Sequence, residues 1–160
     1  MKEIKEQFVT YEIALKLKEL GFDEECLAYY SKEAVYADID YNKTNFVLLS
    51  SKKMGELVGH GSVNNSLFKW LKENDKTSGE LYTLSESVTA SLWQQAIDFL
   101  REKYLLHIEI QSPDYPNDVN FSWSIHKISK FGSLASGESF DYHKVCEQAI
   151  LKAIELCKNN

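Results

Sequence analysis

The sequence predicts a single α+β domain over residues 1–160, with a small, mostly antiparallel sheet and about three principal helices. Three observations carry this prediction. The C-terminal half shows the order helix–strand–strand–helix, the N-terminal third begins with an amphipathic helix, and the hydrophobic content of 44% with 26% charged residues is typical of a globular chain. A chain of 160 residues is also long enough to bury a substantial core.

The first helix is predicted over residues 10–21. Thr10 is its expected N-cap, and Gly21 is the expected glycine after the last turn. Apolar residues with helical spacing form one stripe along it: Ile13, Ala14, Leu17 and Leu20.

Strands are expected next, because residues 24–41 are rich in tyrosine, valine and isoleucine. They predict one or two strands with a turn near Lys32, and residues 45–51 are a further strand candidate. Residues 51–90 read instead as an irregular, insertion-like segment that contains several glycines and asparagines.

One short helix is a candidate inside this irregular segment, over residues 66–76 with Ser66 as its cap. It would bury three side chains: Leu67, Trp70 and Leu71.

The second long helix is predicted over residues 91–104, and it leads directly into a strand without an intervening glycine or proline. Its apolar face comprises Leu92, Trp93, Ala96, Ile97, Leu100 and Tyr104. Residues 104–111 and 119–128 then alternate between apolar and polar, and the turn-rich residues 112–118 join them. This pattern predicts an antiparallel hairpin with one face in the core, where Leu106, Ile108 and Ile110 pair among Val119, Phe121, Trp123 and Ile125.

The last helix is predicted to follow Asp141 as its N-cap and to run to the C-terminus. Its continuous apolar stripe comprises Tyr142, Val145, Cys146, Ala149, Ile150, Ala153, Ile154 and Cys157. The alanines predict a close approach of this helix to the sheet, so that both C-terminal helices cover one sheet face.

The composition predicts a cytoplasmic protein. The three cysteines form no CxxC pair and are expected to be free thiols in a reducing compartment. No apolar stretch approaches the length of a membrane span, and the first residues have no apolar signal-peptide core. A net charge of −6 without a basic tract disfavours nucleic acid as a partner.

Three blocks of sequence resemble a family of small uncharacterised proteins common in bacteriophages and mobile elements of gut anaerobic bacteria: "TYEIALKLKELGF", "LWQQAIDFLREKY" and "DYHKVCEQAILKAIEL". The resemblance departs at Ser91, where a proline is expected. It implies a phage or prophage origin and the cytoplasm of the bacterial host, and it carries over no catalytic residue. The helix–strand–strand–helix order is also similar to double-stranded-RNA-binding domains, but "DYHKVCEQ" lacks the lysine-rich start of their final helix, so this likeness concerns topology only.

The predicted polar face of the hairpin is the first candidate site for a ligand. It gathers His107, Glu109, Gln111, Asn120, Ser122, Ser124 and His126. Two histidines and a carboxylate on one face are suited to proton transfer or to a metal, although a solvated or covered face is the favoured interpretation and no metal ligand is assigned.

A glycine-rich loop and a group of tyrosines are further candidates for ligand binding. The loop residues Gly59, His60 and Gly61 would let backbone amides approach a phosphate, although an ordinary loop is favoured. Tyr29, Tyr30 and Tyr36 would form either a binding surface or the core of the N-terminal strands. Cys26 is favoured as a buried structural cysteine over a nucleophile.

No catalytic motif such as GxSxG or HExxH is present, so the leading hypothesis is a non-enzymatic protein that binds a host protein. The alternative is a sequestering protein for a nucleotide-type bacterial immune signal, bound by the loop and the tyrosines. A third hypothesis is a metal-dependent or acid–base hydrolase that uses the polar face of the hairpin. No cofactor is expected, and the sequence leaves open whether the chain forms a homo-oligomer.

Overall fold

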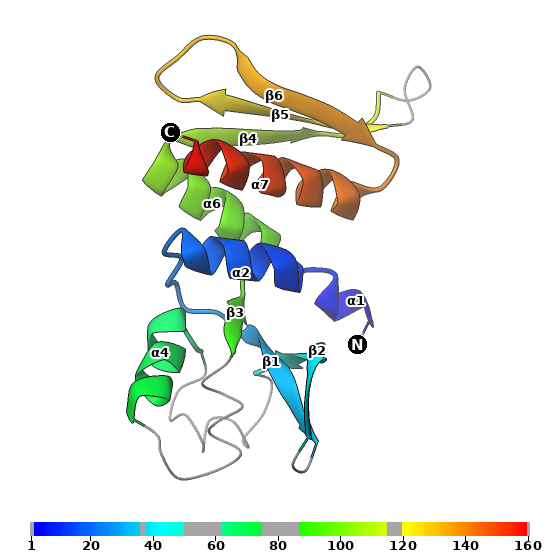
Figure 1. Ribbon diagram of the computed structural model, residues 1–160. Helices are drawn as coiled ribbons and strands as arrows, with labels where there is room; N and C mark the ends of the chain where they lie inside the picture. The colour runs from blue at the N-terminus through cyan, green and yellow to red at the C-terminus, as the bar shows by residue number, and fades with distance from the viewer. Residues whose placement is uncertain (1, 36–37, 50–61, 75–86, 115–119, 160) are drawn as a thin grey trace. The chain divides into compact units, whose positions relative to one another are not determined.

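The computed structural model describes most of the chain, namely residues 2–35, 38–49, 62–74, 87–114 and 120–159. These residues group into two compact units, shown in Figure 1. Unit 1 comprises Thr10–Ser91, and unit 2 combines Lys2–Val9 with Leu92–Asn160. Each unit joins helices to a three-stranded antiparallel sheet, so the α+β class is confirmed, with two small sheets where the sequence predicted one. That residues 1–160 form a single domain stays a prediction.

Unit 1 contains α2 (Tyr11–Glu19), β1 (Ala28–Val35), β2 (Asp38–Leu48), α4 (Asn65–Asn74) and β3 (Val88–Ala90). The predicted first helix is confirmed, and Gly21 ends it with a φ of 83°. The strand order is β2–β1–β3, with β1 antiparallel to both neighbours.

A helix covers each face of β1. Successive side chains of a strand point to opposite faces, so the neighbouring residues Tyr29 and Tyr30 contact different helices. The Tyr29 ring lies 5.5 Å from the ring of Phe68 on α4. The Tyr30 ring lies 5.6 Å from the ring of Tyr11 on α2. α4 and α2 therefore cover opposite faces of this sheet.

The turn predicted near Lys32 is wrong. β1 continues through Lys32 to Val35, with a register irregularity between Lys32 and Glu33, and β2 begins at Asp38. No glycine or proline breaks the chain near Lys32, and a bulge absorbs the irregularity without ending the strand. The separate strand predicted over residues 45–51 belongs to β2, which ends at Leu48.

The irregular segment predicted over residues 51–90 also contains regular structure, since α4, β3 and a bridge between Cys26 and Val63 lie within or against it. β3 and the bridge were missed because each is short, whereas α4 was a candidate helix.

The candidate helix at residues 66–76 exists as α4, but its cap and its buried face differ from the prediction. The backbone N–H of Leu67 donates to Asn64 Oδ1 over 2.9 Å, so Asn64 and not Ser66 caps the helix. Trp70 is 58% exposed, whereas Phe68 is buried at 1%.

Unit 2 contains α1 (Lys2–Lys5), α6 (Trp93–Tyr104), β4 (Leu106–Gln111), β5 (Phe121–Lys127), β6 (Ser133–Ser139) and α7 (Tyr142–Lys158). The predicted hairpin is confirmed by the pairs Ile108–Ile125 and Ile110–Trp123. Val119 lies outside the described residues.

The order helix–strand–strand–helix is corrected to helix–strand–strand–strand–helix, because β6 adds a third strand beside β5. Its sequence, "SLASGES", has no run of large apolar residues, so the pattern resembled a loop. The strand is held at the sheet edge by its ladder with β5 and by Gly137, which pairs with Trp123.

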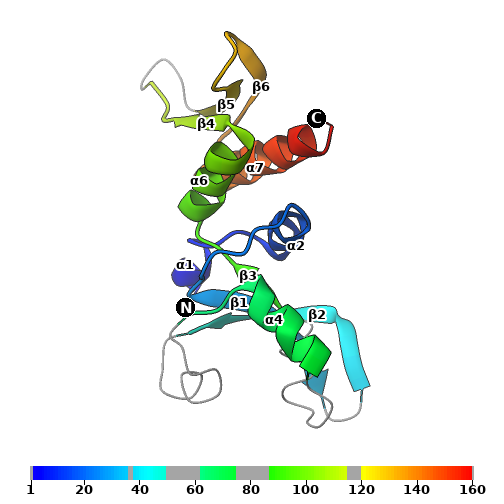
Figure 2. The same ribbon diagram turned by 90° about the vertical axis from the view of Figure 1, so that its left-hand side faces the viewer.

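Both long helices of unit 2 pack on the same face of its sheet, as Figures 1 and 2 show. α7 contacts all three strands, and α6 contacts β4 and α7. The predicted cap is confirmed, since Asp141 Oδ1 accepts the backbone N–H of Lys144 over 3.1 Å. Ala149 and Ala153 are fully buried, which lets α7 approach the sheet closely.

The residues that α6 buries differ in part from those predicted. Phe99 is buried beside Ala96 and Leu100, whereas Trp93 and Ile97 are only half-buried. No helix in the described part of the chain combines the length and the apolar character that crossing a membrane requires.

Candidate functional site

The polar face predicted for the hairpin exists on the side of the β4–β5–β6 sheet away from α6 and α7. His107 lies opposite His126, Glu109 opposite Ser124, and Gln111 opposite Ser122, and directly opposite residues share a face. β6 extends this surface with Ser136 opposite Ser124 and Glu138 opposite Ser122. We call this surface the open face: His107, Glu109, Gln111, Ser122, Ser124, His126, Ser136 and Glu138.

A serine and a histidine of the open face lie within hydrogen-bond distance. Ser124 Oγ is 2.9 Å from Nε2 of His126. A nucleophilic site would also need a group that orients the histidine and donors for an oxyanion. Among the described residues, no group of three or more His, Cys, Asp or Glu converges on a metal position.

The open face changes from polar to apolar at the end next to the β5–β6 turn. The backbone N–H of Ile128 donates to the carbonyl oxygen of Leu105 over 2.9 Å, which extends the β4–β5 ladder by one pair beyond Leu106 and Lys127. Leu105 and Ile128 thus lie next to each other at this end of the ladder.

Two further apolar side chains are exposed at this end, in the turn and the start of β6. We call the four residues the apolar end, with exposed fractions of 47% for Leu105, 57% for Ile128, 110% for Phe131 and 43% for Leu134. Phe131 protrudes completely, because Gly132 (φ 99°) turns the chain directly after it.

The charge at the apolar end is positive. Residues 128–134 carry one basic side chain, Lys130, and no acidic one. This local charge is opposite to the net charge of −6 of the chain. An apolar surface with a basic neighbour fits a partner that is apolar and acidic.

The tyrosines and the cysteine that the sequence singled out lie in the core of unit 1. Tyr29 and Tyr30 are 4% and 3% exposed, so the core interpretation holds for both. Burial raises the pKa of Tyr30 to about 12. Burial also raises the pKa of Cys26 to about 12, which removes the thiolate a nucleophile needs and confirms a buried structural cysteine.

The remaining predicted ligand-binding residues lie outside the described residues: Tyr36, Gly59, His60 and Gly61.

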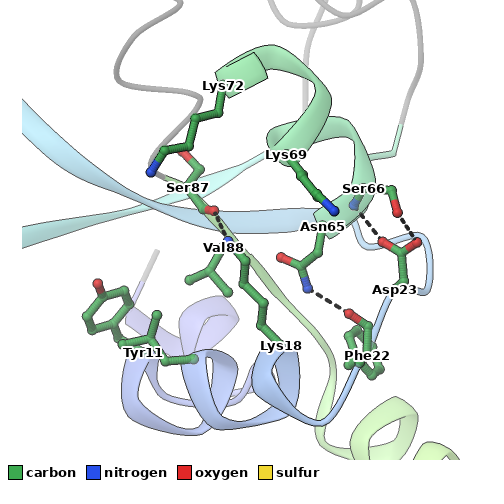
Figure 3. Close-up of a pocket in the computed structure, with 12 residues that line it drawn as sticks. Tyr11, Lys18, Phe22, Asp23, Asn65, Ser66, Lys69, Lys72, Ser87 and Val88 are labelled. Carbon is green, nitrogen blue, oxygen red and sulfur yellow. Dashed lines mark hydrogen bonds between the residues drawn. The ribbon is translucent and has the colours of Figure 1, made fainter.

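Unit 1 also holds a cavity of about 680 Å³, shown in Figure 3, which sequence reasoning missed. It lies between α2 and α4 at the start of the edge strand β3. Its described lining includes Tyr11 and Lys18 of α2, Phe22 of the following turn, and Asn65, Lys69 and Lys72 of α4.

Hydrogen bonds hold the walls of this cavity together. Asn65 Nδ2 donates to the carbonyl oxygen of Phe22 over 2.8 Å, and Asn65 Oδ1 accepts the backbone N–H of Thr89 over 3.2 Å. Lys18 Nζ donates to the carbonyl oxygen of Ser87 over 3.3 Å. The three segments that form the cavity are therefore connected directly to one another.

The cavity had no sequence signal, because its parts are far apart in the chain. Lys18 lies on α2 and Lys69 lies on α4, about fifty positions later. Each lysine alone is an ordinary polar residue of an amphipathic helix.

Comparisons with protein-family models, curated proteins and solved structures found no match to this chain.

Proposed function

We propose that this chain is a non-enzymatic binding protein of phage or prophage origin, and that its partner is a protein of the bacterial host. The observation that carries the proposal is the apolar end of the open face. Single exposed apolar residues are ordinary on a protein surface, but four large ones at one sheet end are typical of an interaction site. Phe131 is the central anchor, because a completely exposed aromatic ring gains most from burial in a partner's pocket.

The partner surface has a defined chemistry under this proposal. It offers an apolar pocket for Phe131, with carboxylates at the rim that face Lys130. Such rim charges mainly accelerate association and select the partner, whereas the buried ring supplies most of the affinity.

The other two hypotheses receive less support from the described residues. Tyr29 and Tyr30 are core residues, so they offer no stacking surface to a nucleotide-type immune signal in the way the sequence suggested. A hydrolase has the Ser124–His126 contact in its favour, and Ser124 also lines a hollow of about 400 Å³ on the open face, but His126 is not among the described residues that line it. Protein binding needs neither a cleft nor a catalytic group.

The proposal is tested by affinity capture from a lysate of a gut anaerobic bacterium, with the double variant Ile128→Ser/Phe131→Ser beside the unsubstituted chain. Loss of the anchor should reduce recovery of a specific host protein by about tenfold or more. The measurement is quantitative mass spectrometry of the captured proteins, followed by calorimetric titration with the purified partner.

Phe140→Ser is the matched control, because Phe140 is also exposed (74%) but follows the opposite end of β6. The control should capture the partner as the unsubstituted chain does. Equal capture by all three proteins would overturn the proposal, and so would equal loss from both variants.

A further inference from the structure

The lysine-lined cavity of unit 1 is a second surface with a chemistry of its own, separate from the open face. Among the described residues of its lining are three lysines, Lys18, Lys69 and Lys72, and one carboxylate, Asp23, which together carry a formal charge of +2. The whole chain carries −6, so this cavity concentrates positive charge against the overall balance.

The lysines come from two helices that flank one strand. Figure 3 shows Lys18 reaching up from α2, and Lys69 and Lys72 extending from α4 on the other side of Val88. Lys69 and Lys72 are three positions apart, which places them on the same side of α4.

The carboxylate of Asp23 is hydrogen-bonded within the protein. One carboxylate oxygen accepts the backbone N–H of Ser66 over 2.6 Å, and the other accepts the Ser66 hydroxyl. Asp23 thus occupies the Ser66 N–H in the first turn of α4, so an anion cannot use this donor, and the charge of Asp23 is already included in the formal charge of +2. The lysines, and not the helix N-terminus, therefore define the anion site.

The uncharged part of the described lining is mixed: Asn65, Ser66 and Ser87 are polar, and the other side chains are apolar or aromatic. Tyr11 and Leu15 contribute from α2, and Phe22 and Val88 complete this part of the cavity. A volume of about 680 Å³ lies within the range of small-molecule sites and exceeds the space that a bare inorganic anion fills.

We infer that this cavity binds a small phosphate monoester that carries an apolar or aromatic body. A dianionic phosphate matches the formal charge of +2, and lysine ammonium groups bind phosphate oxygens as point charges. The apolar body lies against Leu15 and Val88. Binding adds a second ligand to the chain and does not depend on the proposed protein partner.

The test is calorimetric titration of the full chain with adenosine monophosphate as the probe, since it joins a phosphate monoester to an aromatic body. Adenosine and inorganic phosphate are titrated in parallel. We expect adenosine monophosphate to bind at least about tenfold more tightly than either half alone. The double variant Lys69→Gln/Lys72→Gln should weaken binding about tenfold or more, and higher salt should weaken binding to the unsubstituted chain.

Lys16→Gln is the matched control, because Lys16 lies on α2 outside the cavity lining and pairs with Glu12 over 2.6 Å. It should leave the affinity within about twofold, since no direct contact is lost. Lys69 and Lys72 are both exposed, so their removal leaves the core intact, which the unchanged melting temperature of the unliganded variant verifies.

Three results would overturn the inference. They are no binding of adenosine monophosphate at millimolar concentration, equal binding by the double variant and the unsubstituted chain, and equal affinity for adenosine and its monophosphate. Equal affinity for inorganic phosphate and adenosine monophosphate would overturn the inference that the ligand carries an apolar body. Because the probe and the variants involve unit 1 only, failure here leaves the test of the host-protein partner unaffected.

Discussion

A single leucine explains how a helix runs directly into a strand in unit 2. Leu105 adopts a left-handed conformation with φ 57° and ψ 33°, which ends α6 and redirects the chain into β4. A non-glycine residue in this conformation costs about 1–2 kcal/mol. This strained residue is also a member of the apolar end, and its side chain is half exposed.

The carboxylate of Asp141 caps the N-terminus of α7. Its hydrogen bond from the Lys144 backbone N–H lowers the pKa of the Asp141 carboxyl below its usual value. A lowered pKa in the folded state means that the charged cap stabilises the fold above about pH 4. This contribution is lost as the pH falls through the folded-state pKa.

We therefore expect Asp141→Asn to reduce the pH dependence of stability. Asparagine keeps a capping oxygen but does not titrate, so below about pH 4 the unsubstituted chain should lose more stability than the variant. Urea unfolding of both proteins between about pH 2 and pH 7 measures the difference. Parallel pH curves would contradict the role of this carboxylate.

At the scale of elements, β6 depends on a glycine and a tryptophan. A methyl group at Gly137 would lie 2.7 Å from Trp123 Nε1, which is closer than any unstrained contact. The indole occupies the space where Gly137 has no side chain, and its Nε1 donates to Gln148 Oε1 of α7 over 3.2 Å. Trp123 thereby ties the edge strand to the helix that covers the sheet.

Gly137→Ala should lower the free energy of unfolding by about 1–3 kcal/mol, because the added methyl displaces the indole from its packed position. Urea unfolding monitored by tryptophan fluorescence measures the loss. Ser136→Ala, one position earlier on the open face, is the control and should change stability by less than about 0.5 kcal/mol. Similar effects of both substitutions would show that the Gly137–Trp123 contact is not specific.

At the scale of the whole molecule, the first residues of the chain belong to the same unit as its C-terminal part. Phe8 forms a bridge with Leu92, and Trp93 Nε1 donates to the carbonyl oxygen of Glu6 over 2.8 Å. The backbone N–H of Trp93 also donates to the carbonyl oxygen of Gln7 over 3.3 Å. Unit 2 is therefore assembled from two separate stretches, and unit 1 lies between them in sequence.

Trp93→Phe should loosen this N-terminal segment, because phenylalanine lacks the indole donor while the backbone links to Gln7 and Phe8 remain. The expected loss is about 1 kcal/mol, the usual contribution of one hydrogen bond, with faster amide exchange over Lys2–Val9. Hydrogen-exchange mass spectrometry measures the exchange rates of this segment. Trp70→Phe, at an exposed position of α4, should leave exchange in this segment unchanged.

Periodicity determined the parts of the fold in which one face is buried. The stripe on α7 and the alternation in β4 and β5 were predicted because water exclusion imposes helical spacing or alternation on apolar residues. The same alternation placed His107, Glu109, Ser122, Ser124 and His126 on one face. It did not reveal β6, because a polar edge strand is held by ladder hydrogen bonds that leave little trace in side-chain type.

By itself, then, the sequence determined the α+β class, the amphipathic helices at both ends, the central hairpin and the burial of Cys26. Tertiary structure alone decided that the strands form two sheets, that Tyr29 and Tyr30 are both buried, and that lysines of α2 and α4 line one cavity. The reason is physical. Local pattern records which side of an element avoids water, but which elements meet, and which surfaces they leave uncovered, depends on contacts between residues far apart in the chain.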